Sequence, residues 1–433
     1  MENSKALDRL KALFDDGGFT EIDGYSKSAD GEAEAVAGFG YINGRGVYAF
    51  SQDVSVNCGA FSVSQCRKIN KIYDLAIKTG CPVVGIYDSN GVKLTEGFEV
   101  LNAYGEIVKA SAAMSGVCPQ ISVIAGSCLG TSALIANLAD VVVAVRDADF
   151  YVSVPSEVTA EQSAKEGTVD ILCDDFGKAC EEVKNVLDLL PSNNLDVVPS
   201  FDSQNSQKAV DNKDALSLIK SIADDGTVAE LKSEYAANCN TALATFNGAT
   251  VGFVAFDGGA LCPACAYKAE AMVKLCDAYS IPIITVANAD GLIREKENQM
   301  LTALTKLTSA YASATTAKIS VITGTSVGSA YIALAGKGAN ADYTIAWDSA
   351  VASPLDADAA VAFFYNDRLA NGEDREELKK EYEASLASPY TAAACGAVDD
   401  ICTPDKTAEK LAAALDMLEG KRENTLPRKH SVK

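Results

Sequence analysis

The chain has 433 residues, 48% of them hydrophobic and 22% charged, which is long enough to bury two separate cores. Its 59 acidic residues outnumber its 37 basic ones, and the net charge of −22 repels nucleic-acid phosphates and anionic lipid surfaces. Composition therefore argues against a nucleic-acid-binding or membrane-surface protein. Residues 1–16 are charged and amphipathic and lack the apolar stretch of a secretory signal, so a cytoplasmic location is expected.

Histidine and cysteine usage limits the possible chemistry. The single histidine, His430, lies in a polar tail, so a Ser-His-Asp or Cys-His system would have to recruit that tail, and no metal site is predicted. Thirteen cysteines without a secretory signal indicate reduced, mostly buried thiols. The one CxxC motif, Cys262-Pro263-Ala264-Cys265, has no second pair at zinc-ribbon spacing. It is either a redox dithiol or, more commonly for such thiols, part of a packed core.

The first half of the chain alternates helical and strand patterns. An amphipathic helix is expected at Ser64–Thr79, followed by a buried strand at Cys81–Ile86 and a loop with Gly91. The uncharged run Ala110–Ala139 is long enough to cross a membrane, but a proline and several glycines interrupt it. A buried strand, a turn and a buried helix within Ile121–Ala136 explain this run better. Apolar strands that alternate with helices predict an α/β fold.

The second half repeats the first. Ile319–Leu334 (ISVITGTSVGSAYIAL) matches Ile121–Ala136 (ISVIAGSCLGTSALIA) at an offset of 198 residues, without a gap. Upstream, Ile281–Val286 repeats Cys81–Ile86 at an offset of 200, and each copy follows an expected amphipathic helix, at Ala264–Tyr279 and Ser64–Thr79 respectively. Two matches in the same order indicate a duplication.

A polar segment separates the two copies. Leu190–Asp214 is rich in Ser, Asn, Asp and Pro, which is typical of an interdomain linker. The sequence therefore predicts one domain over residues 1–200 and a second over residues 214–433.

A glycine bend joins a strand to a helix in each copy. The first strand is expected to end at Gly126 and to lead into a helix near Gly130, and the second bend lies at Gly328-Ser329-Ala330. The first amides of a helix have no intrahelical acceptor, and glycine lets a substrate carbonyl approach the backbone. Each bend is thus a candidate oxyanion hole built from main-chain N–H groups. The alternative is that these glycines only allow tight packing of helix on sheet.

An ordered set of short segments spans most of residues 35–433: Asn43-Gly44-Arg45, Phe50-Ser51-Gln52-Asp53, Asp88–Gly97 (DSNGVKLTEG), Pro119–Ile124, Cys276–Pro282, Gly328–Tyr331, Ala346-Trp347 and Pro427–His430. This set resembles the biotin-dependent acyl-CoA carboxyltransferases, such as the propionyl-CoA carboxylase β subunit and the methylmalonyl-CoA decarboxylase α subunit. The resemblance implies two tandem ClpP/crotonase-like domains built from ββα spiral repeats, which assemble into trimers or hexamers.

The resemblance also implies a function and its residues. The chain would move a carboxyl group between biotin and a short acyl-CoA, with one oxyanion hole for the thioester and one for the biotin ureido oxygen. The catalytic amides would be those of Gly130, Thr131, Ser329 and Ala330. The positions that bind biotin or CoA would be Gly91, Lys93, Gly328 and Tyr331. No Met-Lys-Met attachment motif occurs, so biotin would be carried by a separate biotin carboxyl carrier protein, with a biotin carboxylase or membrane decarboxylase subunits as further partners.

Two other functions remain open on the sequence. Several family glycines are replaced, as at Asn90, Thr131 and Ser329, which suits a catalytically silent structural subunit of such a complex. A biotin-independent crotonase-type acyl-CoA hydratase or isomerase would use Glu96 and Glu295 for acid–base chemistry, unless these are surface or helix-capping residues. A basic cluster, Arg67, Lys68 and Lys71, is either a binding site for the CoA phosphates or a solvated helix face.

Overall fold

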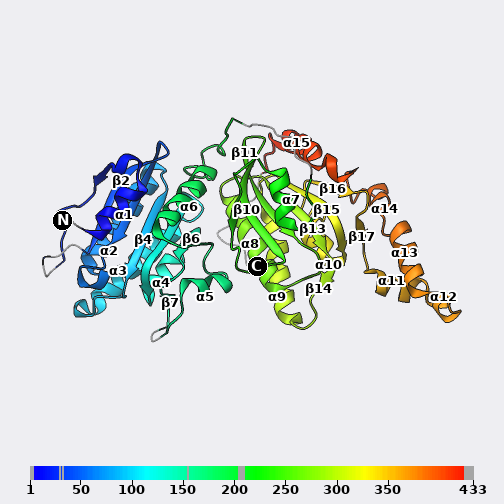
Figure 1. The fold of residues 1–433 in the computed structure, drawn as a ribbon, viewed down its shortest axis with the longest axis horizontal. Helices are drawn as coiled ribbons and strands as arrows, with labels where there is room; N and C mark the ends of the chain where they lie inside the picture. The colour runs from blue at the N-terminus through cyan, green and yellow to red at the C-terminus, as the bar shows by residue number, and fades with distance from the viewer. Residues whose placement is uncertain (1–3, 29–30, 32–33, 154–155, 203–209, 424–433) are drawn as a thin grey trace. The chain divides into compact units, whose positions relative to one another are not determined.

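The computed structural model describes residues 4–28, 31, 34–153, 156–202 and 210–423, and the chain forms two compact units. The first unit comprises Met1–Pro199 together with Leu231–Tyr235, and the second comprises Ser200–Glu230 and Ala236–Lys433. The segment Pro427–His430 lies outside the described residues. Figure 1 shows that each unit is a β-sheet with helices packed against it, which confirms the predicted α/β class.

The first unit contains one mixed sheet with the strand order β1-β2-β3-β4-β5-β6-β8, and β7 pairs with β5 outside this path. Its strands are β1 (Phe19–Glu21), β2 (Ala35–Ile42), β3 (Arg45–Gln52), β4 (Val83–Ser89), β5 (Gln120–Leu129), β6 (Val141–Val145), β7 (Phe150–Tyr151) and β8 (Ile171–Cys173). The first three strands are antiparallel, and the remaining pairs are parallel. Asn43-Gly44, both with positive φ, form the β2–β3 turn, which is typical of type I′ hairpins.

The second unit repeats this topology. Its main sheet has the order β18-β16-β15-β13-β11-β10-β9, β17 pairs with β15, and β12 and β14 form a small separate sheet. Its strands are β9 (Ala229–Leu231), β10 (Cys239–Phe246), β11 (Ala249–Phe256), β12 (Ala260–Leu261), β13 (Ile283–Ala289), β14 (Gly291–Leu292), β15 (Lys318–Val327), β16 (Tyr343–Trp347), β17 (Val351–Ser353) and β18 (Asp400–Cys402). The same irregularity in register occurs after Tyr87 in the first sheet and after Ala287 in the second. The duplication inferred from the sequence is therefore a duplication of the whole sheet.

Most helices lie in the connections between parallel strands, and the others precede the first strand or follow the last strand of each unit. The first unit has α1 (Lys5–Leu13), α2 (Val63–Thr79), α3 (Phe98–Met114), α4 (Thr131–Ala136), α5 (Ala160–Lys165) and α6 (Phe176–Leu189). The second has α7 (Ala215–Ile222), α8 (Pro263–Ala278), α9 (Glu297–Ser313), α10 (Gly328–Leu334), α11 (Ala357–Phe364), α12 (Asn366–Ala370), α13 (Arg375–Ser385), α14 (Pro389–Ala394) and α15 (Thr407–Leu418). Helix α2 packs beside α3 in the first unit, and α8 packs beside α9 in the second. The predicted helices at Ser64–Thr79 and Ala264–Tyr279 are confirmed within one residue.

The strands before the two glycine bends are longer than the sequence predicts. Strand β5 continues through Gly126 to Leu129, and β15 continues through Gly324 to Val327, so the expected end of the strand at Gly126 is wrong. The added residues pair with a strand from farther along the chain: Cys128 and Leu129 with β7, and Thr325 to Val327 with β17. Local glycine content cannot reveal such a pairing partner, which is why the prediction failed.

The uncharged run Ala110–Ala139 contains the end of α3, strand β5 and helix α4, as expected. Within the described ranges, no helix is long and apolar enough to cross a membrane.

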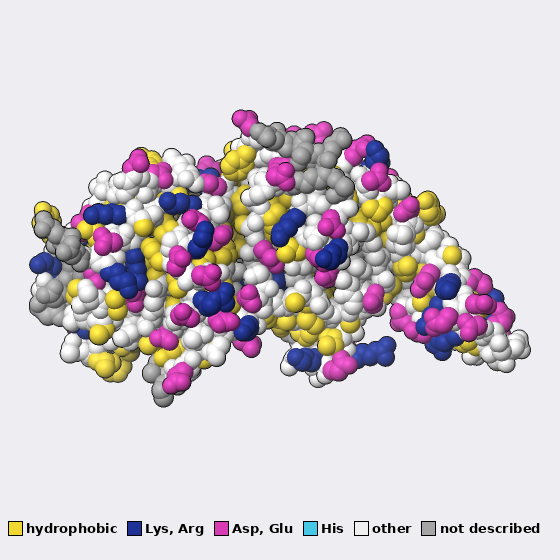
Figure 2. Space-filling model, in the orientation of Figure 1, with side chains coloured by type: hydrophobic (Ala, Val, Ile, Leu, Met, Phe, Trp, Pro, Cys, Tyr) yellow, Lys and Arg dark blue, Asp and Glu magenta, His cyan; other side chains and the backbone are white. Residues whose placement is uncertain are grey.

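The second unit also carries a surface helical cluster, α11 to α13, where charged side chains are dense at the lower right of Figure 2. Arg368 pairs there with Glu373 and Glu381, and both partners are exposed, so these pairs contribute little to stability.

Candidate active site

The first candidate site is the bend between β5 and α4. Gly130 has φ 64° and ψ −132°, a backbone conformation that side chains with a Cβ rarely adopt. A Cβ at this position would meet nothing within 4 Å, so the conformation and not crowding requires glycine. Helix α4 starts at Thr131, and the Gly130 carbonyl accepts its first hydrogen bond, from the Ala133 N–H at 3.1 Å.

One of the two predicted donors at this bend is already occupied. The Gly130 N–H donates to the Tyr151 carbonyl at 2.9 Å, which continues the ladder between β5 and β7. The resemblance assigns this amide to a substrate oxygen, but here its acceptor comes from a strand that the sequence did not predict. The Thr131 N–H makes no hydrogen bond to any residue in the described part of the chain. Thr131 therefore remains as the available donor, and Gly130 supplies the turn.

The second candidate site is the bend between β15 and α10. Gly328 has φ 53°, and a Cβ there would lie 3.2 Å from the Pro354 carbonyl oxygen. Ser329 is exposed and Ala330 is buried, and both lie in the first turn of α10, where amides have no acceptor one turn earlier. The Tyr331 hydroxyl donates to the Ala397 carbonyl at 2.8 Å, and burial raises the pKa of this phenol. The side chain of Tyr331 thus anchors α10 to its own unit.

A polar side chain from the neighbouring strand packs under each bend. A Cβ on Gly126 would lie 2.2 Å from Asp88 Oδ1, and a Cβ on Gly324 would lie 2.2 Å from Asn288 Oδ1. These glycines therefore make room for Asp88 and Asn288, which occupy equivalent positions at the ends of β4 and β13. The close-packing alternative of the sequence analysis holds for this pair of glycines, whereas Gly130 is required for its backbone conformation.

Asp88 is held by a buried cation. Arg9 on α1 donates from Nη2 to Asp88 Oδ2 at 2.7 Å and to the Ala125 carbonyl at 3.1 Å. Both side chains are nearly inaccessible, at 6% and 5% exposure. Lys5 approaches the same carboxylate at 3.4 Å but is mostly exposed. The role of Arg9 cannot be read from the sequence, because nothing in the local pattern of α1 indicates that this residue reaches a strand far along the chain.

The loop after β4 carries the predicted residues Gly91 and Lys93. Gly91 has φ 110°, its N–H donates to Ser89 Oγ at 3.1 Å, and a Cβ there would lie 3.9 Å from the Leu129 carbonyl oxygen. The loop of Gly91 therefore lies beside the end of β5 and the Gly130 bend. In the second unit, the equivalent residues Gly291 and Leu292 form β14, which packs against α10.

Lys93 is neutralised within the first unit. Its Nζ lies 3.0 Å from Glu34 Oε1 and 3.9 Å from Glu96 Oε1, and only 12% of its side chain is exposed. Glu34 is buried and also accepts a hydrogen bond from Ser62 Oγ at 2.8 Å. A phosphate at Lys93 would have to compete with these carboxylates, so the geometry does not favour the predicted role in CoA binding.

The carboxylates considered for a hydratase have ordinary structural positions. Glu96 Oε2 accepts a hydrogen bond from the Val63 N–H at 2.6 Å and so caps the start of α2. Glu295 is exposed.

The basic cluster on α2 is also divided: Lys68 is buried and donates to the Ala35 carbonyl at 3.0 Å, and Lys71 pairs with Asp23 at 2.5 Å. Both lysines therefore have a protein partner, although Lys71 is about half exposed.

The segment Phe50–Asp53 organises the first unit from within. Gln52 donates from Nε2 to Gln65 Oε1 at 3.0 Å on α2, and its Oε1 accepts the Asp88 N–H at 3.1 Å. Asp53 accepts hydrogen bonds from the Ser4 and Ser55 hydroxyls. Burial alone would raise the pKa of Asp53, but these hydrogen bonds outweigh it and lower that pKa. The segment thus connects α1, α2 and β4, the elements that surround Asp88.

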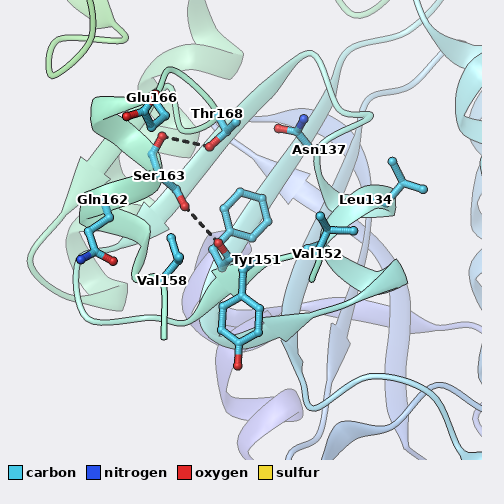
Figure 3. Close-up of a pocket in the computed structure, with 11 residues that line it drawn as sticks. Leu134, Asn137, Tyr151, Val152, Val158, Gln162, Ser163, Glu166 and Thr168 are labelled. Atoms are coloured by element: carbon cyan, nitrogen blue, oxygen red, sulfur yellow. Dashed lines mark hydrogen bonds between the residues drawn. The ribbon is translucent and has the colours of Figure 1, made fainter. Parts of the chain in front are cut away.

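A pocket of about 580 Å³ adjoins the first bend (Figure 3). It is lined by residues of α4, β7 and α5 and of the adjoining loops, namely Ala133, Leu134, Asn137, Phe150, Tyr151, Val152, Val158, Gln162, Ser163, Glu166 and Thr168. Ser163 Oγ donates to the Phe150 carbonyl at 3.0 Å, and Thr168 Oγ1 donates to the Ser163 carbonyl at 2.9 Å, so these hydroxyls are satisfied. Gly130 and Thr131 do not line this pocket. Tyr151 lines it and also accepts the hydrogen bond from the Gly130 N–H at the bend.

The structure thus groups the predicted residues in two places. Gly91, Gly130 and Thr131 lie close together in the first unit, while Gly328, Ser329, Ala330 and Tyr331 lie together in the second. No cluster of three or more His, Cys, Asp or Glu side chains suited to a metal ion occurs among the residues with described positions. What both units offer is a strand, a glycine bend and the first amides of a short helix, from residues that range from the exposed Ser329 to the buried Ala330.

Known proteins are similar to this chain over nearly its whole length. A family model described as the carboxyl transferase domain matches residues 3–432. The methylmalonyl-CoA decarboxylase subunit alpha of Propionigenium modestum is 32% identical over an alignment of 478 positions, which covers 98% of this chain and 92% of that protein. The propionyl-CoA carboxylase beta chain of Roseobacter denitrificans is 31% identical, with the same two coverages. The chain therefore belongs to the carboxyl transferase family, as the sequence resemblance implied.

A solved structure agrees with the fold. The structure of the transcarboxylase 12S subunit with hydrolysed methylmalonyl-coenzyme A bound superposes with a TM-score of 0.92 at 29% identity and covers 98% of this chain and 92% of that one. Transcarboxylase 12S assembles into a hexamer. The likeness confirms the expected fold of two tandem crotonase-like domains.

Proposed function

We propose that this chain is the carboxyltransferase component that moves a carboxyl group between biotin and a short acyl-CoA, in a carboxylase or a decarboxylase complex. The family match over residues 3–432 carries this proposal, and relatives that act on methylmalonyl-CoA or propionyl-CoA indicate the substrate class. Membership of this family also disfavours the hydratase or isomerase alternative, as does the capping role of Glu96.

The residues at the two bends would stabilise negative oxygens. In the first unit, the Thr131 N–H would donate to the thioester oxygen as the enolate forms, while the bond from Gly130 to Tyr151 holds the bend in place. In the second unit, the Ser329 and Ala330 amides would donate to the ureido oxygen of biotin, which supplies or accepts the carboxyl group when it is bound. The exposed position of Ser329 suits an oxygen that arrives from solvent. This division of roles requires no imidazole.

Biotin would reach the chain on a separate carrier protein. A biotin carboxylase or membrane decarboxylase subunits would complete the complex, and the chain itself would form trimers or hexamers in the cytoplasm. The support is that the relatives are subunits of multi-component enzymes and that transcarboxylase 12S forms a hexamer. Size-exclusion chromatography with light scattering tests the oligomer, and co-purification with the biotinylated carrier tests the partner.

The direct test is an assay with the full chain and a biotinylated carrier. Methylmalonyl-CoA or malonyl-CoA should lose CO₂ slowly in the presence of the carrier or free biotin and not without them. Absence of turnover of any CoA thioester with every carrier would reject the proposal.

Matched variants at the bends test the amides themselves. Thr131→Pro removes the N–H at the first position of α4, where proline is tolerated, and Thr131→Ala retains it. Loss of one oxyanion donor lowers kcat roughly 100- to 1,000-fold, so Thr131→Pro should show this loss while Thr131→Ala remains near wild type. Ser329→Pro and Ser329→Ala form the matching comparison at the second position of α10, where proline is still within the first turn. Equal rates for the proline and alanine variants would contradict the catalytic role of that bend.

A second candidate is a catalytically silent structural subunit. The bond from Gly130 to Tyr151 and the neutralised Lys93 favour it, because both features reduce the groups available to a CoA thioester. Titration calorimetry with CoA and methylmalonyl-CoA discriminates between the candidates. Binding is expected for the enzyme, and no binding together with normal assembly is expected for the structural subunit.

A further inference from the structure

The CxxC motif of the second unit forms a close pair of thiols at the start of a long helix. Cys262 is the N-cap of α8, and its Sγ accepts a hydrogen bond from the Cys265 N–H at 3.3 Å. The two sulfur atoms lie 3.1 Å apart. Cys262 is partly exposed, whereas Cys265 is buried, at 1% exposure. The Cys262 sulfur can therefore react with a reagent from solvent, and the buried Cys265 sulfur lies next to it.

The duplication shows that this helix start does not require thiols. The equivalent residues in the first unit are Ser62, the N-cap of α2, and Gln65, whose N–H donates to Ser62 Oγ at 3.1 Å. The same cap geometry is therefore built there from a hydroxyl. Two cysteines at the corresponding positions of the second unit add a chemical property and not a necessary element of the fold.

The surroundings of the pair favour the ionised form of Cys262. The hydrogen bond between the two thiols, with smaller contributions from the amides at the start of α8, lowers the pKa of Cys262 to about 6 despite partial burial. The same hydrogen bond and burial raise the pKa of Cys265. A thiolate in front of a protonated thiol is the arrangement that thiol–disulfide exchange needs.

We propose that Cys262 and Cys265 are a redox-active dithiol, which small-molecule disulfides oxidise to an intramolecular disulfide and small-molecule thiols reduce again. The Cys262 thiolate attacks one sulfur of the oxidant, forms a mixed disulfide and releases one thiolate. Cys265 then loses its proton to solvent and attacks the Cys262 sulfur, which closes the protein disulfide and releases the second thiolate. Two protein thiols and one disulfide thus give one protein disulfide and two thiols, and the oxidant accepts both electrons.

The position of the dithiol gives its oxidation a local consequence. Cys262 directly follows β12, which pairs with Gly291 and Leu292 of β14. Disulfide formation removes the negative charge on Cys262, which accepts hydrogen bonds from the amides at the start of α8. The backbone amides of this turn and of the adjoining small sheet should therefore exchange their hydrogens with solvent faster. The proposed carboxyl transfer is not needed for this inference.

The test is oxidation of the reduced full chain with glutathione disulfide, followed by acid quenching and peptide mass mapping. The expected product is a Cys262–Cys265 disulfide, seen as the loss of two hydrogen atoms from one peptide, which dithiothreitol reverses. Cys265→Ala should instead accumulate a glutathione adduct on Cys262, because the resolving thiol is missing. Cys262→Ser retains a capping oxygen, as Ser62 shows, and should form neither product at Cys265. If Cys265→Ala does not fold, the wild type and Cys262→Ser alone decide the question.

Alkylation rates provide an independent readout. At pH 6.5, iodoacetamide should modify Cys262 about fivefold faster than an ordinary thiol, since a larger thiolate fraction outweighs its lower nucleophilicity. Cys58 and Cys395 are also exposed and control for access alone. A lasting glutathione adduct on Cys262 in the wild type, or oxidation at Cys58 and Cys395 without any at Cys262, would overturn the proposal.

Discussion

The two units have the same strand order but stabilise their glycine bends with different chemistry. Under the first bend lies a carboxylate, Asp88, balanced by the buried Arg9. Under the second lies a neutral amide, Asn288, whose Oδ1 accepts the Thr325 N–H at 3.1 Å. The first solution needs an additional helix, α1, to bring its cation, while the second needs only a neighbouring amide of its own sheet.

This difference separates what the fold requires from what each unit adds. Both units need a polar oxygen beneath the bend and a glycine that makes room for it. A charge at this position is not required, since the second unit forms the bend without one. A buried ion pair costs desolvation energy for both partners, so the first unit depends on Arg9 in a way that the second unit cannot match.

The largest expected effect is the loss of this cation. Arg9→Met leaves the buried Asp88 with only the exposed Lys5 nearby and should lower the free energy of unfolding by about 3–5 kcal/mol. Lys5→Met is the control, since Lys5 is exposed and should change stability by less than about 1 kcal/mol. Urea unfolding followed by circular dichroism measures the change, while fluorescence of Trp347, the single tryptophan, follows the second unit. Adding Asp88→Asn to Arg9→Met should recover part of the loss. If Arg9→Met and Lys5→Met lowered the free energy of unfolding equally, the first unit would not depend on the buried Arg9, and this difference between the two units would not hold.

The next effect concerns the glycines that make room for Asp88 and Asn288. Gly126→Ala and Gly324→Ala should each destabilise the protein by about 1–3 kcal/mol through overpacking. Gly105→Ala is a control of opposite sign, because Gly105 lies on α3 with open space around it, and alanine should stabilise the helix by about 0.5–1 kcal/mol. Thermal unfolding of the three variants gives the order. A neutral Gly324→Ala would show that the two bends are not packed alike.

The helix caps should differ less. Ser62→Ala and Cys262→Ala each remove an N-cap, which costs about 1 kcal/mol. Ser62→Ala should cost more than Cys262→Ala, because Ser62 also donates to the buried Glu34. Cys262→Ser should be at least as stable as the wild type under reducing conditions. Urea unfolding measures both variants. If Cys262→Ala lowered the free energy of unfolding more than Ser62→Ala, the expected order of the two caps would be wrong.

The smallest expected effect depends on pH. The lowered pKa of Asp53 means that its hydrogen bonds stabilise the fold above the unfolded-state pKa and are lost as the pH falls through the folded-state value. Ser55→Ala removes one of these donors and should cost about 1 kcal/mol at pH 7. The difference from wild type should shrink below about pH 4 as the carboxyl becomes protonated. A difference that stays constant from pH 7 to pH 3 would show that Ser55 acts without Asp53.

Several features of the fold and site followed from local pattern. The repeated ISVI strands, the amphipathic helices and the spacing of Gly130 and Gly328 predicted the duplication, the α/β class and both bends. The sequence could not show that β7 returns to the end of β5, where the Tyr151 carbonyl accepts the Gly130 N–H. The sequence placed Lys93 among the positions that bind biotin or CoA. In the structure, Glu34, which is distant in sequence, neutralises the Lys93 side chain.

The sequence by itself determined the periodic elements, the repeat and the family, since these depend on residues close together in the chain or on matching segments. Only the tertiary structure decided which polar groups meet: Arg9 with Asp88, Gly130 with Tyr151, and Glu34 with Lys93. The physical reason is that a hydrogen bond or ion pair between distant residues leaves no periodic trace in the chain. Such contacts form where the sheet brings strand ends together, and they determine which amides remain available for chemistry.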